Sequence, residues 1–489
     1  MLNPIKYLQY HQDVSPKFIA IQALDKAYTF RELFSIVKKV AFRLRQLGVK
    51  PNQLVVNCFN DPLLDWIMTL AIFHEASITC SNHGYSPLEN TLKVDWILTD
   101  RPEITGLPPE KTLTINAAWI NESLAGVHHN DPNEYVDASS LCRLMLTSGT
   151  TGHRKSVAIS IADLEGRLKT GLTYWTTPGR EINLQGLSTI GGFFSVLDAL
   201  SVGAPLYLFQ NRVIDTIRKF NINSLIGSPV QIANLLGQIT NPHEYPTSIE
   251  IVRVSGGAMS PLLLKNIKEK LTHNIVNVYG STELGGVCIS RPLELMSSET
   301  IAGYALPDVQ IQIVNELHKV LPHGNEGSIR VKAPFMVHEY YNDQEGSAKS
   351  FIDGWFYPGD RGRLMNDGLL VLGGRNSELI NRGGVKIDPA SIDQFLLDYE
   401  GIKDAAVFGL ENKMGIEDIA AAIVAVENFD TKALKLDLMK KYGADRTPSL
   451  FFFVAQIPRN HMGKVMRGHM SNFFAEFMAK REEEKKFAE

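Results

Sequence analysis

Hydroxyl and glycine residues gather in one short stretch of the chain, which ends at a lysine. The apolar run Leu144–Leu146 leads into this stretch, and Lys155 closes it. Glycines let backbone N–H groups turn toward an anion, hydroxyls add donors, and the lysine adds positive charge. The spacing is not that of a Walker A loop. An ordinary turn is the alternative, but a run of this length favours a polyphosphate site. The candidate ligands are Thr147, Ser148, Gly149, Thr150, Thr151, Gly152 and Lys155.

Two further turns with glycine follow apolar runs. Ser255–Ala258 comes directly after Ile251–Val254, and Glu283 ends the run Asn277–Glu283. The Glu283 carboxylate is a hard oxygen ligand of the kind that suits Mg²⁺ bridging phosphates. Tyr279 offers a flat face for a base. The alternatives are a plain strand-end turn, a solvated surface glutamate and a core tyrosine.

Three charged residues nearer the end of the chain also follow glycines. These are Asp360, Arg375 and Lys464. An aspartate can accept hydrogen bonds from both hydroxyls of a ribose, and an arginine can make forked contacts with ribose or phosphate. Each has a plainer alternative, namely a turn-forming aspartate, a surface ion pair and a surface charge.

The motifs that contain these residues resemble, in order, those of the adenylate-forming superfamily. This superfamily includes acyl-CoA synthetases, nonribosomal adenylation domains and firefly-type luciferases. The resemblance covers residues 144 to 467. It is carried by Thr147–Lys155, Asn277–Glu283, Gly354–Leu364, Gly374–Ile380 with Gly383-Gly384, and Pro458–Arg467.

The resemblance implies a role for each matching residue. Lys464 would bridge the substrate carboxylate and the α-phosphate, where well-placed donors are worth roughly 3–4 kcal/mol each. Thr282 and Glu283 would complete the catalytic set, with Glu283 as the magnesium ligand. Ser377 would be the hinge. Gly383 and Gly384 would lie at the tunnel through which the thiol substrate enters. The residues that would bind ATP or AMP, besides the phosphate loop, are Gly256, Gly257, Ala258, Tyr279, Gly280, Ser281, Asp360 and Arg375.

The implied reaction has two steps and uses ATP and Mg²⁺. A carboxylate attacks the α-phosphate and releases pyrophosphate, which leaves an acyl-adenylate. A thiol of CoA, or of the phosphopantetheine arm on an acyl or peptidyl carrier protein, then displaces AMP. In the family the small domain rotates between the steps, which is hinge switching at a domain junction.

The chain departs from the family pattern at several positions. Arg154 stands in the phosphate loop where proline is usual, and Asn460 stands where threonine is common. Ser377 occupies the hinge position, which is normally Asp or Lys, although serine can still serve as a hinge. Ser188–Phe194 lacks the acidic residue that amino-acid-activating members carry, so we expect an uncharged aryl or acyl acid. Core packing is an equally good interpretation of each pocket candidate. These candidates are Thr189, Phe193, Phe194, Pro229, Gly285, Gly286 and Val287.

Apolar periodicity indicates the elements that must position these residues. Thr29–Gly48 reads as a helix capped by Thr29 and Glu32, with Phe42 and Leu47 on its apolar face. Strand-like runs then alternate with helical ones as far as about residue 300, a pattern that favours layered α/β subdomains. A β-rich subdomain follows. We expect an N-terminal AMP- and acid-binding domain over residues 1–375 and a small, mobile α+β lid domain over 376–489.

Length and composition exclude several classes of protein. The 489 residues carry a net charge of −4, which does not suggest a nucleic-acid partner. With 44% hydrophobic and 21% charged residues the chain is not disordered. The run Leu63–Phe73 is too short to span a membrane. Four scattered cysteines indicate a reduced, cytoplasmic protein, and a homodimer is left open.

Three other functions remain open at this stage. One is an adenylating enzyme that loads a carrier protein, and another is a luciferase-like oxygenase. The third is a non-catalytic scaffold, which would need none of Lys155, Glu283, Asp360, Arg375 and Lys464 together.

Overall fold

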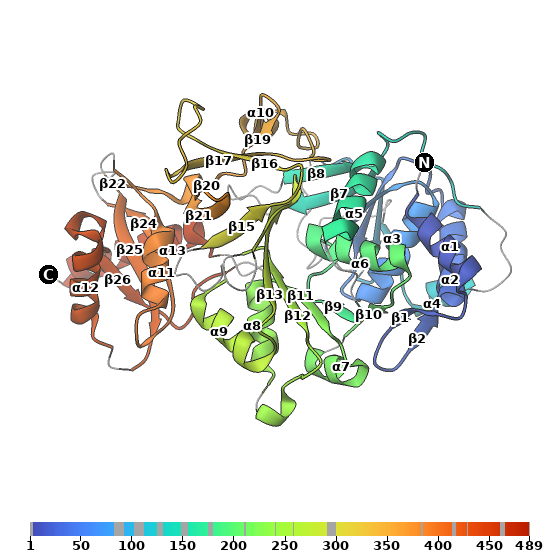
Figure 1. Ribbon diagram of the computed structural model, residues 1–489, viewed down its shortest axis with the longest axis horizontal. Coiled ribbons are helices and arrows are strands. Elements are labelled where there is room, and N and C mark those ends of the chain that lie inside the picture. The colour runs from blue at the N-terminus through green and yellow to red at the C-terminus, as the bar shows by residue number, and fades with distance from the viewer. Residues whose placement is uncertain are drawn as a thin grey trace.

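The computed structural model is elongated, with the two ends of the chain toward opposite ends of the molecule (Figure 1). Its element order alternates helices and strands, as the sequence predicted. The structure describes residues 3–82, 92–101, 112–124, 131–147, 155–174, 179–209, 212–239, 241–257, 259–290, 300–382, 385–412, 417–427, 429–459 and 465–488.

The N-terminal part is built on a six-stranded sheet in the order β6-β5-β3-β4-β7-β8. Its strands are parallel except for the antiparallel pair β7–β8, which flanks the predicted phosphate loop. A small sheet, β10-β1-β2, lies beside it. The strands are β1 (Ile19–Gln22), β2 (Ala27–Thr29), β3 (Leu54–Cys58), β4 (Ile78–Ser81), β5 (Trp96–Thr99), β6 (Thr112–Thr114), β7 (Leu141–Thr147), β8 (Lys155–Ser160) and β10 (Leu206–Tyr207).

Helix α2 shows how local sequence sets these boundaries. Thr29 caps it, its hydroxyl accepting from the Glu32 amide while the Glu32 carboxylate accepts from the Thr29 amide. Leu33 is buried in the core. Phe42 is only half-buried and Leu47 is exposed, so the predicted apolar face is narrower than expected. The helices of this part are α1 (Ile5–Val14), α2 (Phe30–Gln46), α3 (Pro62–His74), α4 (Ala117–Leu124), α5 (Ile161–Tyr174) and α6 (Ile190–Val202).

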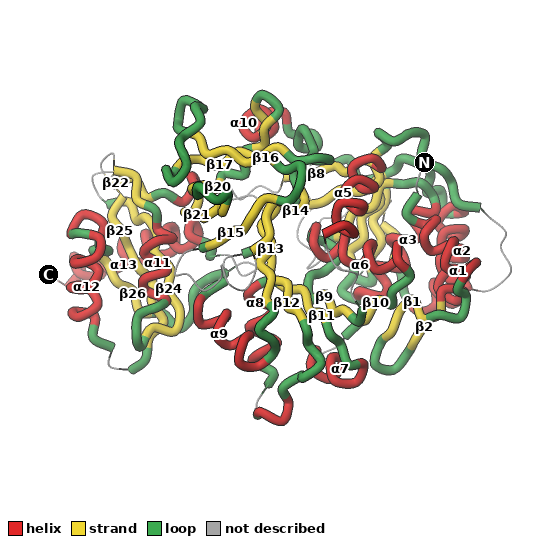
Figure 2. The backbone as a smooth tube through the Cα atoms, viewed as in Figure 1, coloured by secondary structure: helices red, strands yellow, loops and turns green. Residues whose placement is uncertain are grey.

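A second, twelve-stranded sheet runs through the middle of the molecule (Figure 2). One half is parallel and contains β9, β11, β12 and β13. From β14 onward the pairing is antiparallel, which gives the predicted β-rich subdomain. The strands are β9 (Glu181–Asn183), β11 (Ser224–Gly227), β12 (Ile251–Ser255), β13 (Ile275–Ser281), β14 (Gly285–Ser290), β15 (Ile301–Ala305), β16 (Gln310–Val314), β17 (Gly327–Lys332), β18 (Phe351–Ile352), β19 (Trp355–Phe356), β20 (Asp360–Leu364) and β21 (Leu369–Arg375). The associated helices are α7 (Val213–Phe220), α8 (Pro229–Gly237), α9 (Pro261–Lys270) and α10 (Gln344–Ser350).

The C-terminal part is a small α+β unit, as predicted. Its sheet has the order β24-β25-β26, and a β22–β23 hairpin lies nearby. Two apolar clusters, whose members all come from residue 380 onward, form its core. The elements are β22 (Ile380–Arg382), β23 (Val385–Ile387), α11 (Pro389–Leu397), β24 (Ile402–Glu411), β25 (Glu417–Ala425), α12 (Thr431–Tyr442), β26 (Leu450–Phe453) and α13 (Arg467–Ala488).

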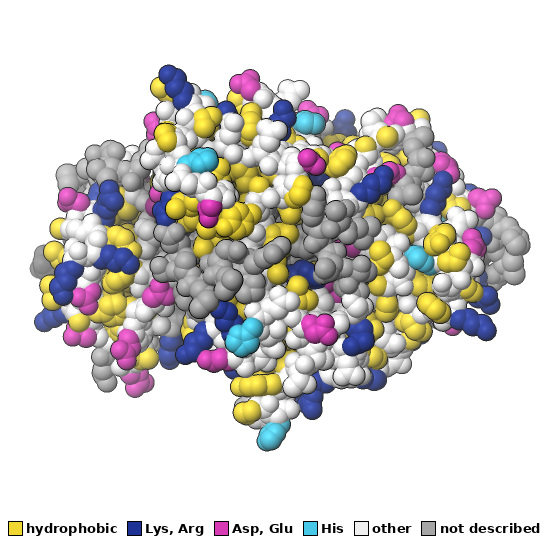
Figure 3. Space-filling view, viewed as in Figure 1, with side chains coloured by type: hydrophobic (Ala, Val, Ile, Leu, Met, Phe, Trp, Pro, Cys, Tyr) yellow, Lys and Arg dark blue, Asp and Glu magenta, His cyan; other side chains and the backbone are white. Residues whose placement is uncertain are grey.

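The surface and the cysteines agree with the composition. Basic and acidic side chains are interspersed on the face shown in Figure 3, and the four cysteines are free and buried. Among the helices of the described residues, none has both the length and the apolar character needed to cross a membrane.

Gly303 is required on β15, which links β14 to β21 within the antiparallel half of the large sheet. Its φ is +110°, and an added Cβ would overlap the carbonyl group of Ile289 on β14. Strand β15 pairs with both β14 and β21, so Gly303 helps to hold β21 in place.

Replacing Gly303 by alanine should destabilise the protein more than Gly324→Ala does. Gly324 also has a positive φ, of +82°, but nothing within 4 Å of an added Cβ. Both variants bear the strain of a left-handed backbone, and Gly303→Ala adds an overlap with main-chain atoms, worth about 1–3 kcal/mol more. Urea denaturation of the two variants would measure the difference. Equal losses would contradict this account.

Candidate active site

One cavity of about 1720 Å³ brings together most of the site residues predicted from the sequence. It extends from the carboxyl ends of β11, β12 and β13 to the β-rich subdomain and the C-terminal part. The predicted residues that line it are Thr147, Lys155, Thr189, Phe194, Pro229, Gly256, Gly257, Tyr279, Gly280, Ser281, Thr282, Glu283, Gly285, Gly286, Asp360 and Arg375.

Two predicted pocket residues are wrong. Phe193 is fully buried, packs against Phe73 with ring centroids 6.3 Å apart, and does not line the cavity. Adjacent residues of a helix point about 100° apart, which turns Phe193 into the core and Phe194 toward the cavity. Val287 is also fully buried, on the opposite side of β14 from Gly286.

The remaining candidates lie elsewhere. Ser377 is exposed in a short 3₁₀ helix, Asn376–Glu378, that leads from β21 into the C-terminal part. Nine candidates fall outside the described residues. They are Ser148, Gly149, Thr150, Thr151, Gly152, Ala258, Gly383, Gly384 and Lys464.

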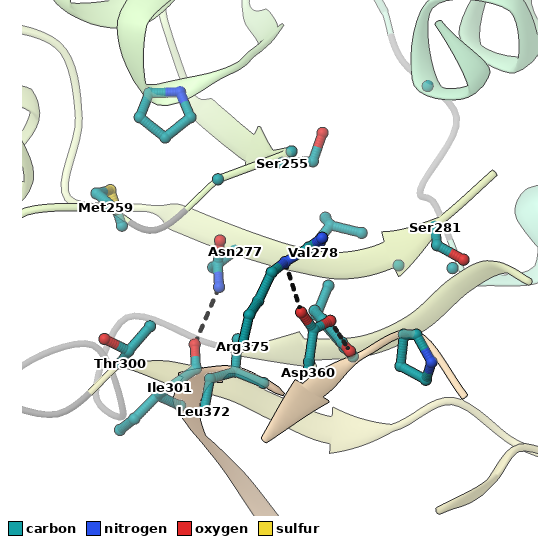
Figure 4. A pocket seen from close by; sticks show the side chains of 18 of the residues that line it. Ser255, Met259, Asn277, Val278, Ser281, Thr300, Ile301, Asp360, Leu372 and Arg375 are labelled. Atoms are coloured by element: carbon teal, nitrogen blue, oxygen red, sulfur yellow. Dashed lines mark hydrogen bonds and ion pairs between the residues drawn. The ribbon is translucent and has the colours of Figure 1, made fainter. Parts of the chain in front are cut away.

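Asp360 on β20 is held between the side chain of Arg375, from the paired strand β21 (Figure 4), and that of Tyr279, from β13. The Arg375 Nε lies 2.9 Å from Oδ1, and the Tyr279 hydroxyl donates to Oδ2 at 2.7 Å. Burial and the adjacent Asp360 carboxylate raise the pKa of Tyr279 well above its usual value, which keeps the phenol protonated as a donor. A carboxylate has about four lone-pair positions, so Asp360 can still accept from two hydroxyls of a ligand.

Glu283 is the second fixed carboxylate and is 8% exposed. The Tyr340 hydroxyl donates to its Oε1 at 2.8 Å. Lys155 Nζ lies 4.2 Å from the centroid of the same tyrosine ring and 3.4 Å from Ser350 Oγ. Tyr340 therefore contacts both the predicted metal ligand and the lysine of the phosphate loop.

Arg167 on α5 stabilises the turn that carries Glu283 through hydrogen bonds to backbone carbonyls. Its guanidinium donates to the carbonyl oxygens of Thr282 at 2.9 Å, Glu283 at 2.8 Å and Phe335 at 2.9 Å. Burial lowers the pKa of Arg167 to about 10, so the side chain stays charged at neutral pH. Sequence analysis identified neither Arg167 nor Tyr340, because no local pattern marks them.

The residues fit a magnesium ion that is held mainly by its substrate. The described residues contain no group of three or more His, Cys, Asp or Glu that could cage a metal. Magnesium typically uses one or two carboxylates together with phosphate oxygens, and Glu283 supplies such a carboxylate near Lys155, since both contact Tyr340.

A polar cluster that the sequence did not reveal lines the cavity between the sheet and α6. Glu181 Oε2 pairs with Arg253 Nη1 at 2.5 Å, and Asp198 lies close by. The Oδ1 atom of Asp198 is buried and has no hydrogen-bond partner. Burial, and then the Glu181 charge, raise the pKa of Asp198 to about 8, against a smaller lowering by Arg253.

Arg467, from the last predicted motif, connects the hinge region to the C-terminal core. Its Nη1 lies 2.7 Å from a Glu378 carboxylate oxygen, Nη2 pairs with Asp393, and Nε donates to the Val407 carbonyl at 2.9 Å. Burial raises the pKa of Asp393 to about 6 even beside this arginine. The arginine of the motif therefore fixes the part of the chain that follows Ser377.

The large mixed sheet, the ordered motifs and the shared cavity define a protein of the adenylate-forming type. More narrowly, the chain belongs to the AMP-binding enzyme family, which matches residues 8–341. It is 25% identical to the 2-succinylbenzoate–CoA ligase of Listeria monocytogenes over 482 residues, which cover 95% of this chain and 98% of that protein.

Solved structures share the same fold. The ATP-bound MatB structure from Rhodopseudomonas palustris has a TM-score of 0.86 at 21% identity, covering 97% of this chain and 99% of that one. The o-succinylbenzoate CoA synthetase of Bacillus subtilis, in complex with its acyl-adenylate intermediate, has a TM-score of 0.79 at 22% identity, covering 95% and 97%. The predicted superfamily and fold class are thus confirmed.

The buried Asp198 carboxyl should give the protein a distinct pH dependence of stability. Its ordinary pKa is 3.8 and the folded protein raises it to about 8, so only the folded state keeps the proton between these values. Raising the pH through this window weakens folding. Asp198→Asn removes the titration, so the melting temperature of the variant relative to wild type should rise from pH 4 to pH 8 and then level off. A difference that is independent of pH would contradict the assignment; Asp13→Asn, at an exposed site, is the control.

Proposed function

We propose that this protein is an acid–CoA ligase, which activates a carboxylic acid as an acyl-adenylate and then forms its CoA thioester. The observation that carries the proposal is the Asp360 carboxylate, fixed by Tyr279 and Arg375 in the same cavity as Glu283. Membership of the AMP-binding family supports it. So do full-length relatives named 2-succinylbenzoate–CoA ligase and oxalate–CoA ligase.

The nucleotide side of the reaction needs positioning more than covalent chemistry. Asp360 accepts hydrogen bonds from the ribose hydroxyls, with Arg375 beside it, and the adenine lies against Gly256 and Gly257. Glu283 would hold Mg²⁺, which would supply charge neutralisation, and Lys155 adds positive charge at the end of the phosphate loop. Charge neutralisation around an in-line displacement is the main contribution that a protein makes to this type of step.

In the first step a carboxylate oxygen of the acid bonds to the α-phosphorus as the bond to pyrophosphate breaks. Lys464 stabilises the two negative groups as they approach. The acid lies among Thr189, Phe194 and the glycines Gly285 and Gly286, with Pro229 opposite. Because Ser188–Phe194 carries no acidic residue, an aryl or acyl acid without an α-amino group is the expected substrate.

In the second step the thiol sulfur of CoA bonds to the acyl carbon, AMP leaves, and the thiol proton is released to solvent. The boundary near residue 375 separates the two domains, which turn about Ser377. This rotation withdraws Lys464 and brings Gly383 and Gly384 to the thiol. A cytoplasmic location, where ATP and CoA are available, stays a prediction.

Exchange of labelled pyrophosphate into ATP tests the first step with a panel of carboxylic acids. The panel should include 2-succinylbenzoate, oxalate, anthranilate, straight-chain acids and α-amino acids. Thioester formation is then compared with free CoA and with a phosphopantetheinylated carrier protein. Exchange with at least one acid and transfer to CoA are expected. If exchange occurs but the acyl group is transferred only to the carrier protein, the carrier protein and not CoA is the acceptor. No exchange with any acid would favour the scaffold alternative.

Lys464→Ala should separate the two half-reactions. Adenylation should fall by about 100-fold or more, because the lysine compensates charge only in the first step. Thioester formation from supplied acyl-adenylate should largely survive. Lys480→Ala, on the exposed part of α13, is the control. An equal loss of both half-reactions would contradict the two-state description of the lid.

Tyr340→Phe should reveal the role of the hydroxyl that orients Glu283. The variant keeps the ring beneath Lys155 but loses the donor to the Glu283 carboxylate. We expect pyrophosphate exchange to fall by about 10-fold, which is typical for a lost hydrogen bond to a charged group, and half-saturation to require more Mg²⁺.

Tyr341→Phe is the matched control for this variant. Among the described residues the Tyr341 hydroxyl has no hydrogen bond, and its ring packs on a separate apolar cluster. A Tyr340→Phe enzyme with unchanged Mg²⁺ dependence would show that the hydroxyl does not act through Glu283.

A further inference from the structure

The acid side of the cavity has a polar inner end formed by four side chains, which we call the inner cluster: Glu181, Asp198, Ser195 and Arg253. The β9–β11–β12 register places Glu181, Ser224 and Arg253 on one face of the sheet, because side chains alternate along a strand. Ser195 and Asp198 approach from α6, and all four residues of the cluster line the same cavity as the nucleotide residues.

Within the inner cluster the Glu181 carboxylate receives several hydrogen bonds, whereas one oxygen of the Asp198 carboxyl receives none. Glu181 receives the Arg253 guanidinium, the Ser224 hydroxyl at 2.8 Å and the Ser195 hydroxyl at 2.9 Å. Asp198 Oδ1 receives no donor. The charged or titratable groups that influence Asp198 are Glu181 on β9 and Arg253 on β12, and Asp198 in turn acts on Tyr7 of α1. The cation among these groups, Arg253, is paired with Glu181.

A buried carboxyl oxygen without a donor is costly. A buried polar atom left unsatisfied destabilises the folded state, and such atoms in folded proteins nearly always have a partner. This one lies in the wall of a cavity, where a ligand can supply the donor. Its position thus matches a ligand contact better than a contact within the core.

We propose that the acid substrate carries a hydrogen-bond donor, a hydroxyl or amino group, at the end remote from its carboxylate, and that Asp198 accepts this hydrogen bond. This inference rests on the proposed function and specifies the substrate class of the same site.

The helix geometry sets the length of such a substrate. Gly191, Phe194, Ser195 and Asp198 all line the cavity and recur at the spacing of one helix face. At 1.5 Å per residue, Asp198 lies about 10 Å further along α6 than Gly191. The wall between them contains Phe194 and, from β11, Ile226. An acid with an apolar spacer, such as a phenylpropanoate or a six-carbon chain, and a polar end group fits this arrangement.

The same cluster disfavours a second carboxylate at that depth. Arg253 is already paired with Glu181, so an incoming carboxylate would lie beside the Glu181 charge with no further cation of the cluster to offset it. Replacing the end group of one carbon skeleton therefore gives a sharp test.

Pyrophosphate exchange should be measured with matched acids on wild type, Asp198→Leu and Asp198→Asn. The aromatic set is 3-phenylpropanoate and its 4-hydroxy and 4-amino derivatives, and the aliphatic set is hexanoate, 6-hydroxyhexanoate and adipate. Wild type should prefer the acids with a donor by about 10- to 100-fold in kcat/KM, the range expected for one hydrogen bond to a charged or buried carboxyl group. Adipate should be the poorest of its set.

Asp198→Leu should abolish this preference or reverse it toward the unsubstituted acids, and Asp198→Asn should weaken it. Asp13→Asn, at an exposed site, should leave it unchanged. Exchange without discrimination in wild type would overturn this inference while leaving the ligase proposal standing. A loss of activity with all acids alike in both Asp198 variants would also overturn it. No exchange with any acid across the wider panel would overturn the ligase proposal and this inference together.

Discussion

The Tyr279–Asp360–Arg375 arrangement is the contact on which the geometry of this molecule depends. Tyr279 lies near the end of β13, in the parallel half of the large sheet, whereas Asp360 and Arg375 lie on paired strands of the antiparallel half. The hydrogen bond from Tyr279 to Asp360 therefore joins two differently built regions, and Arg375 holds the same carboxylate from within the antiparallel half. A ligand that binds this carboxylate contacts both halves at once. The chain leaves β21 immediately after Arg375, so the same point is also where the C-terminal part begins.

Buried arginines hold the backbone around the cavity in place. Arg167 binds three backbone carbonyls and thereby fixes the turn that presents Glu283. Arg143, fully buried on β7, donates to Thr79 and Ser81 of the adjacent strand β4 and to the Leu187 carbonyl that precedes α6. Neither arginine reaches out to a surface carboxylate. Each uses the fork geometry of the guanidinium to hold several acceptors, so the loops around the cavity are positioned by the protein itself before any ligand binds.

The predicted nucleotide residues that the structure describes all line one cavity, and they come from local motifs. A strand that ends in a glycine turn places a carboxylate or hydroxyl at the sheet edge, and this relation can be read within a few residues, as at Glu283 and Asp360. Helix boundaries such as those of α2 and α11 also follow from local capping. Phe193 and Val287 show the limit of this approach. Whether a residue faces a cavity or the core depends on the orientation of a helix or strand relative to partners that are far away in the sequence.

The inner cluster contains cavity residues that the sequence did not reveal, for the same reason. Glu181, Asp198 and Arg253 belong to three elements. The parallel register of β9, β11 and β12 brings Glu181 and Arg253 together, and the packing of α6 against β9 adds Asp198. The nucleotide side depends on glycine turns whose backbone geometry tolerates few changes, whereas the acid side depends on single side chains projecting from regular elements. Side chains of the second kind can be exchanged without moving the backbone that binds ATP. Under the proposed function, this separation within one cavity would let a single adenylation scaffold accept chemically different acids, and the determinants of that choice would lie on α6 and on the β9–β12 face rather than in the motifs.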